Sequence, residues 1–200
     1  MVFGLFITRW FETYVEYKGK YYRVLHPRPT IVLGTLCSNN RINFMPASWN
    51  TPLSEEPPTV GVVVDRETYT NECLESLGEA TINVPSDTQL QLVYNIGSVT
   101  GRDVDKVSKF SLELVPSTLI KPPGLKGSVA ILESRVYEKI PIGEVNFYVF
   151  EVLLTKVLEG VADEWSIDFS KTNILLHGAG RVFHRVAPTK IFAKKNPSHD

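Results

Sequence analysis

Cysteine is scarce in this chain, with only Cys37 and Cys73 among 200 residues. Neither belongs to a CxxC pair, and two cysteines are too few for a disulfide framework. The four histidines are scattered along the chain and have no close cysteine neighbour, so a structural zinc site is not expected. We therefore predict two free thiols in a reducing cytoplasm and no metal.

Long apolar runs and an excess of one charge are also missing. The apolar run that precedes Thr8 and Arg9 is too short for a signal-peptide core or a membrane span, and no other segment spans a bilayer. The formal net charge of -1 leaves no basic surplus for a phosphate backbone. Neither a membrane nor a nucleic acid is expected as a partner.

Several catalytic signatures are absent. The chain has no G-x-S-x-G elbow and no P-loop GK[ST], which removes support for a serine acyl transferase or a nucleotide hydrolase. Gly178-Ala179-Gly180 begins like a dinucleotide fingerprint, but Phe183 occupies the third glycine position and no helix is expected after it. We reject a Rossmann interpretation.

The composition that remains, 43% hydrophobic and 22% charged, is typical of one globular domain, here residues 1–200. Aromatic residues crowd an N-terminal arm, residues 1–25. We expect this arm to cover a surface of its own subunit or of a dimer partner, because so much apolar area would otherwise face water. Residues 195–200 are polar and are expected to fray.

Strand patterns dominate the rest of the chain. They cover residues 30–37, 43–49, 59–65, 80–85, 128–140, 145–158 and 181–186. One short helix is expected after Thr68 or Thr70 and ends at Gly78, and another follows the capping box Ser86–Gln89 and ends at Gly97. Because no strand-helix-strand repeat occurs, we predict a mainly β fold, a closed or nearly closed antiparallel barrel.

A proline-containing segment, residues 43–58, here called the ribbon, is a candidate ligand-binding strip. Its prolines confine it to an edge strand or a loop, because each lacks an N–H and fixes its φ angle. Small hydrogen-bonding residues surround Trp49, and such a strip suits a flat heteroaromatic ligand. The alternative is a rigid surface loop without a ligand.

A second candidate is the start of the first helix. There the free N–H groups, the Thr hydroxyls and Arg66 would together form a phosphate cradle. The alternative is that Thr68, Thr70 and Asn71 only cap the helix, which every helix start requires.

These segments, taken in order, resemble the flavin-reductase-like FMN-binding split-barrel family, which includes flavoredoxins and FMN-dependent ferric reductases. The resemblance rests on LHPRPTIVLGT (25–35), N-x-x-P-x-S-W (43–49), P-x-S-x-x-P-P (52–58), R-x-T-x-x-N (66–71), GEATINVP (78–85), a G…D…KF connector (101–110) and LLHGAGRVF (175–183). It implies a Greek-key antiparallel split barrel, a homodimer, and one FMN per subunit near the dimer interface.

The resemblance also implies which residues hold FMN. The ring would lie along Asn43, Pro46, Ala47, Ser48, Trp49 and Asn50. The phosphate would be held by Arg66, Thr68, Thr70, Asn71 and Lys109. His177 and Gly178 would approach the ring or the mouth of the pocket.

One departure concerns the nicotinamide. Many reductases of the family carry Gly-Asp-His where this chain has Gly143-Glu144-Val145-Asn146, and Asn146 cannot carry a proton charge. His177 and Asn146 are the catalytic candidates. The expected function is electron transfer from NAD(P)H through FMN to free flavin, ferric ion or a protein. The alternatives are an FMN-carrying electron-transfer module and a dimeric scaffold without cofactor.

Overall fold

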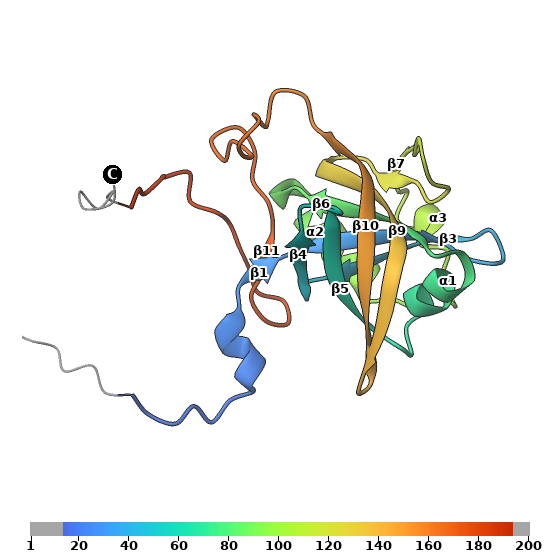
Figure 1. The fold of residues 1–200 in the computed structure, drawn as a ribbon, viewed down its shortest axis with the longest axis horizontal. Coiled ribbons are helices and arrows are strands. Elements are labelled where there is room, and N and C mark those ends of the chain that lie inside the picture. The colour runs from blue at the N-terminus through green and yellow to red at the C-terminus, as the bar shows by residue number, and fades with distance from the viewer. Residues whose placement is uncertain (1–13, 194–200) are drawn as a thin grey trace, which may run out of the picture.

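The computed structural model describes residues 14–193, which form a mainly β architecture with short helices (Figure 1). The strands are β1 (Arg28–Pro29), β2 (Ile31–Leu36), β3 (Ile42–Ala47), β4 (Asn50–Ser54), β5 (Thr59–Asp65), β6 (Glu79–Pro85), β7 (Leu114–Val115), β8 (Gly124–Leu125), β9 (Ser128–Ile142), β10 (Val145–Val157), β11 (Leu176–His177) and β12 (Phe183–His184). The helices are η1 (Tyr21–Leu25), α1 (Tyr69–Leu77), η2 (Asp87–Gln89), α2 (Leu90–Gly97) and α3 (Lys106–Lys109). The predicted mainly β class with antiparallel pairing is confirmed.

Seven strands form the main sheet in the order β3-β2-β6-β9-β10-β5-β4, and all of its pairs are antiparallel. The two edge strands, β3 and β4, are consecutive in the chain and only Ser48 and Trp49 separate them. The N–H of Val63 in β5 donates to the carbonyl of Trp49 at 2.9 Å. This bond holds the link beside β5, at the opposite end of the strand order from β3. The ribbon therefore supplies both edges, as its prolines require.

Two hairpins were anticipated from turn residues. Asn40 adopts a left-handed φ of 61° in the β2–β3 turn, a conformation that asparagine tolerates well. The long β9–β10 hairpin turns at Gly143, whose φ is 53°. β9 runs on to Ile142, two residues beyond the predicted strand end, because Val145 still pairs with Ile142.

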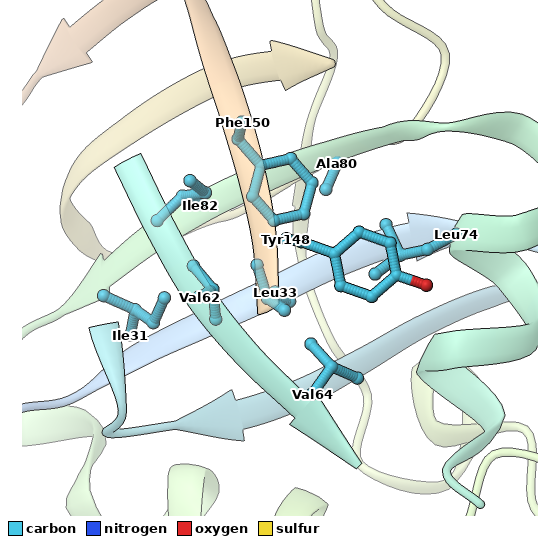
Figure 2. Packing of buried hydrophobic residues seen from close by; sticks show 9 residues of the cluster. All are labelled: Ile31, Leu33, Val62, Val64, Leu74, Ala80, Ile82, Tyr148 and Phe150. Carbon is cyan, nitrogen blue, oxygen red and sulfur yellow. The ribbon is translucent and has the colours of Figure 1, made fainter. Parts of the chain in front are cut away.

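Two apolar cores lie on opposite sides of β2. Ile31 and Leu33 face the first core, whereas Val32 faces the second, as the alternation of a strand dictates. Figure 2 shows the first core, with the Tyr148 ring among aliphatic side chains and its hydroxyl directed toward α1. The second core packs α2 against β2 and β3.

The two predicted helices begin and end at the predicted residues. The Thr68 side chain caps α1, and Gly78 ends it with a φ of 70°. Ser86 and Gln89 form a reciprocal capping box before α2. The polar connector of residues 101–110 contains a third helix, α3, that was not predicted. Asp105 begins α3 by accepting from the Ser108 N–H at 3.2 Å.

The chain ends differ in part from expectation. The last strand is limited to β12, which pairs with β11 in a small sheet ordered β1-β11-β12. Of the N-terminal arm only residues from Tyr14 onward lie within the described part, and the predicted frayed tail lies outside it. Within residues 14–193 no helix is both long enough and apolar enough to cross a bilayer.

The prediction of two free thiols is wrong. Cys37 and Cys73 form a disulfide with their Cα atoms 4.2 Å apart. The error arose because the two cysteines are distant in sequence, whereas the packing of α1 against β2 brings them together. A cytoplasmic location rested on free thiols and therefore remains a prediction without that support.

Reduction of this disulfide is expected to lower the free energy of unfolding by about 3–4 kcal/mol, because the cross-link spans 36 residues and restricts the unfolded chain. Urea unfolding with and without dithiothreitol measures the effect. The matched control is the double variant Cys37→Ala, Cys73→Ala, whose midpoint should not respond to the reductant. Equal midpoints for the wild-type protein under both conditions would contradict the cross-link.

Candidate functional site

Three adjacent hollows follow β3 and the Ser48–Trp49 link after it, and they form one groove because neighbouring hollows share wall residues. The helix-end cavity, about 380 Å³, lies at the first turn of α1. It shares Gly97 and Ser98 with the central cavity, about 210 Å³. The central cavity in turn shares Ser48, His177 and Gly180 with the histidine cavity, about 460 Å³, which reaches η1. Hollows of this combined size hold cofactors in many proteins.

The first part of the ribbon, residues 43–49, lines this groove. Asn43 borders the helix-end cavity, and Pro46 and Ala47 border the central cavity. Trp49 borders the histidine cavity, where its ring meets Tyr22 edge-on with centroids 5.4 Å apart.

Two members of the predicted strip have further roles at its end. Ser48 lies between the central and histidine cavities. Asn50 is directed elsewhere, because its side-chain amide donates to the carbonyl of Pro29 at 2.9 Å. It lines a fourth, apolar hollow on the outside of β5, which shares Tyr22, His26 and Trp49 with the histidine cavity. The structure thus brings together five of the six predicted ring contacts.

The start of α1 meets the ribbon directly. The side-chain amide of Asn43 donates to the Thr70 hydroxyl at 2.9 Å. Thr68 and Thr70 both line the helix-end cavity, and the Thr68 hydroxyl oxygen accepts from the Asn71 N–H at 3.2 Å. The N–H groups of Tyr69 and Thr70 precede the first intrahelical donors and are left for a ligand or water.

Arg66, Asn71 and Asn146 lie outside the three cavities. Arg66 donates through Nε to Asn146 Oδ1 at 3.2 Å, and Asn146 donates to Asn71 Oδ1 at 2.9 Å. The Tyr148 hydroxyl donates to the same Asn71 oxygen at 2.7 Å. Burial, together with the charge of Glu75, raises the pKa of Tyr148 above its usual value. These four residues form a polar network beneath α1, so the phosphate and nicotinamide roles expected of Arg66, Asn71 and Asn146 gain no contact with the groove.

A buried lysine that the sequence analysis missed lines the helix-end cavity. Lys106 is 4% exposed, and its ammonium group donates to the carbonyl of Phe44 at 2.8 Å. Burial lowers the pKa of Lys106 to about 8. No ion pair of Lys106 occurs among the described residues, so an anion in the cavity would supply its missing counter-charge.

Lys109, the predicted lysine, is exposed and lies 5.7 Å from the centre of the Phe110 ring. It borders none of the three cavities. The missed signal was Asp105 with Ser108, an N-cap pattern that predicts the start of α3 but not which of its lysines faces inward.

Two buried polar atoms on the groove lack partners within the described chain. They are Asn43 Oδ1, in the helix-end cavity, and Thr30 Oγ1, in the central cavity. Leaving such an atom unsatisfied costs about 1–3 kcal/mol, a cost that a bound polar ligand can offset. Gly101 also borders the helix-end cavity, and a Cβ there would lie 2.2 Å from Asn43 Oδ1. The groove therefore fits a ligand that combines a polar edge with an anionic group.

His177 stands where the central and histidine cavities meet, as predicted, and Gly178 follows it on the wall of the histidine cavity. Its Nδ1 is 3.1 Å from the Ser48 hydroxyl, and its Nε2 is 3.2 Å from the carbonyl oxygen of Gly180. The His26 ring binds the carbonyl of His177 through Nδ1 at 3.0 Å. His26 was not among the predicted site residues. It is far from His177 in the sequence, and the pairing of β1 with β11 brings the two together.

Acidic groups also border the groove, but they do not form a metal centre. Asp65 and Glu67 line the helix-end cavity, where Asp65 Oδ1 accepts from the Glu67 N–H at 2.8 Å. Within residues 14–193 no group of three or more His, Cys, Asp or Glu side chains could hold a metal ion. The chemistry of this groove therefore depends on what it binds and on the Ser, Thr, His and Lys groups that surround it.

Comparison with known proteins agrees with this geometry. A protein of Archaeoglobus fulgidus is 35% identical over 111 residues, 56% of this chain, and the chain spans 63% of that relative's length. YddH of Escherichia coli K12 is 30% identical over 168 residues, 79% of this chain and 87% of YddH. The structure of an FMN-binding protein from Thermus thermophilus with bound 1-cyclohex-2-enone is similar with a TM-score of 0.77 and 26% identity, covering 92% of this chain and 99% of that one.

The family model for the flavin reductase like domain matches residues 22–184. That range contains every strand of the seven-stranded sheet and, apart from Lys20, every residue that lines the three cavities. The resemblance noted in the sequence is thereby confirmed, and the chain belongs to the flavin-reductase-like family.

Proposed function

We propose that this chain is an FMN-dependent oxidoreductase that passes electrons from NAD(P)H to an acceptor. One observation carries the proposal: the ribbon and the start of α1 meet at the Asn43–Thr70 hydrogen bond, 2.9 Å long, and line one groove. Family membership and the FMN-binding relative from Thermus thermophilus support FMN as the cofactor. Oxidoreductase activity agrees with the family to which the chain belongs.

The helix-end cavity suits the phosphate of FMN. The free N–H groups of the first turn of α1, the Thr68 and Thr70 hydroxyls and the Lys106 ammonium group would hold it. Pro46, Ala47 and Ser48 would then lie along the ring in the central cavity. In this arrangement Lys106 takes the role that the sequence assigned to Lys109.

The histidine cavity suits a second substrate. It adjoins the proposed ring position through Ser48 and His177, so a nicotinamide placed there would lie beside the ring. Its wall carries two cations, Lys20 and Arg23, and one carboxylate, Glu144. The bound flavin would supply the redox chemistry, accepting a hydride and passing its electrons on. The chain would bind, orient and polarise the reactants.

An FMN-carrying electron-transfer module remains the second candidate. It is favoured by Asn146. This asparagine lies in the stretch where many reductases of the family carry Gly-Asp-His, and its side chain is buried, with 5% exposed, in the polar network beneath α1. A buried amide of this kind cannot seat a nicotinamide.

We also propose that the sheet closes as a split barrel and that two copies of the chain pair. Ser48 and Trp49 are the only residues between the two edge strands, which favours closure at that end. Exposed apolar side chains near η1 and the ribbon favour a covering partner. They include Tyr21, Val24, Leu25 and Leu53.

FMN should bind at least about tenfold more tightly than riboflavin, because a charge-assisted contact to Lys106 acts on the phosphate alone. Lys106→Met should remove most of this preference, whereas Lys109→Met, on the same helix, should keep it. Fluorescence quenching of both flavins by each variant measures the ratio.

The same preference should depend on pH. Without ligand the pKa of Lys106 is about 8, so the lysine loses its charge as the pH rises above about 8 and the preference for FMN should fall there. The Lys106→Met variant should show no such fall.

In the comparison of the two lysine variants, a preference for FMN that is lost in Lys109→Met but kept in Lys106→Met would assign the phosphate contact to Lys109 instead of Lys106.

Anaerobic addition of NADH or NADPH to the FMN-loaded protein should bleach the flavin absorbance. Oxidised absorbance should return when free flavin or ferric ion is added. A protein that stays yellow with both nicotinamides but is bleached by dithionite would leave the electron-transfer module as the function. A protein that shows no flavin absorbance and no thermal shift with FMN would indicate the scaffold.

A further inference from the structure

The hydrogen-bond partners of His177 determine where its proton lies. The carbonyl oxygen of Gly180 can only accept, so Nε2 of His177, 3.2 Å away, must carry a hydrogen. In the neutral ring Nδ1 is then an acceptor, and the Ser48 hydroxyl at 3.1 Å must donate to it. The hydroxyl hydrogen of Ser48 therefore points at Nδ1 of His177, and the lone pairs of the Ser48 oxygen are left to accept from a group in the groove.

Protonation of His177 reverses this bond. Both ring nitrogens then carry hydrogens, Nδ1 donates to the Ser48 oxygen, and the Ser48 hydroxyl hydrogen is released toward the groove. No backbone movement is required, because only the hydroxyl rotates.

The surrounding contacts hold the pair in place. Arg28 donates through Nε to the carbonyl of Ser48 at 3.0 Å, and Nδ1 of His26 donates to the carbonyl of His177 at 3.0 Å. Arg28 and His177 are also register partners of β1 and β11, which lie side by side in Figure 1. Ser48 and His177 are therefore fixed by their backbones as well as by their side chains.

We propose that His177 is a positioning residue that switches Ser48 between hydrogen-bond acceptor and donor toward the ligand ring. The inference rests on the proposed function, in that the ring is that of FMN. An oxidised flavin presents mainly acceptors along its polar edge, whereas reduction adds an N–H at N5. Protonated His177 would thus favour the oxidised ring, and neutral His177 the reduced one.

Other ionisable groups surround the pair. Those that face it from neighbouring elements are Lys20, Arg23, His26, Arg28, Glu144 and His184. The test therefore compares variants at each pH instead of relying on a single pH profile.

The first measurement uses the protein without flavin. Nitrogen-15 NMR of the histidine side chains should show neutral His177 with its hydrogen on Nε2. A neutral ring with its hydrogen on Nδ1 would overturn the proposal, whatever the protein binds.

The second measurement is the dissociation constant of oxidised FMN for the wild-type protein and for Ser48→Ala, at pH 5.5 and at pH 8.5. Loss of Ser48 should weaken binding about fivefold at the lower pH, the effect of one neutral hydrogen bond, and hardly at all at the higher pH. Effects of pH on the FMN phosphate and on Lys106 are common to both proteins and cancel in the ratio.

Two histidine variants complete the design. In a His177→Asn background the effect of Ser48→Ala should no longer depend on pH. In a His184→Asn background the effect should still depend on pH, because His184 borders none of the three cavities and does not bind Ser48. A ratio unaffected by pH in the wild-type protein, or one still dependent on pH without His177, would overturn the proposal. Absence of FMN binding by the wild-type protein would instead refute the proposed cofactor, and the NMR result would then decide the pair alone.

Discussion

The hydrogen bond from the Asn43 side chain to the Thr70 hydroxyl joins the two halves of the site. One partner belongs to an edge strand of the main sheet and the other to the first turn of α1, and both are buried. A buried bond of this kind resists exchange with water, so the distance between ribbon and helix is fixed before any ligand arrives. The groove depends on that distance, because its helix-end cavity lies between these two elements.

The disulfide adds a covalent link between α1 and the β2–β3 hairpin at the same junction. Cys37 directly follows β2, the strand that pairs with β3, and Cys73 lies in α1, one turn after the residues that border the helix-end cavity. A cross-link at this point limits how far the helix can move away from the β2–β3 hairpin. The covalent bond that stabilises the fold therefore also limits the shape of the cavity.

Two buried charged residues, Glu133 and Lys106, differ in the partners that they have within the described chain. Glu133 is fully buried, but it accepts from the N–H groups of Thr118 and Leu119 and pairs with Lys156. Lys106 is almost as deeply buried and has one carbonyl partner and no carboxylate among the described residues. A buried ion that is fully partnered holds a loop, whereas a buried ion that lacks a counter-charge marks a place for a ligand.

Local sequence determined most strands of the main sheet, the caps of α1 and α2 and the turns of the two hairpins, because proline, glycine, asparagine and threonine act on the backbone within a few residues. It also placed Thr68, Thr70 and the ribbon in one site, through the ordered likeness to a family. Tertiary structure alone decided that Cys37 meets Cys73, that Lys106 and not Lys109 faces the groove, and that Asn146 lies beneath α1. Those contacts join residues far apart in the chain or depend on which side of a short helix points inward, and neither is set by nearest neighbours in the sequence.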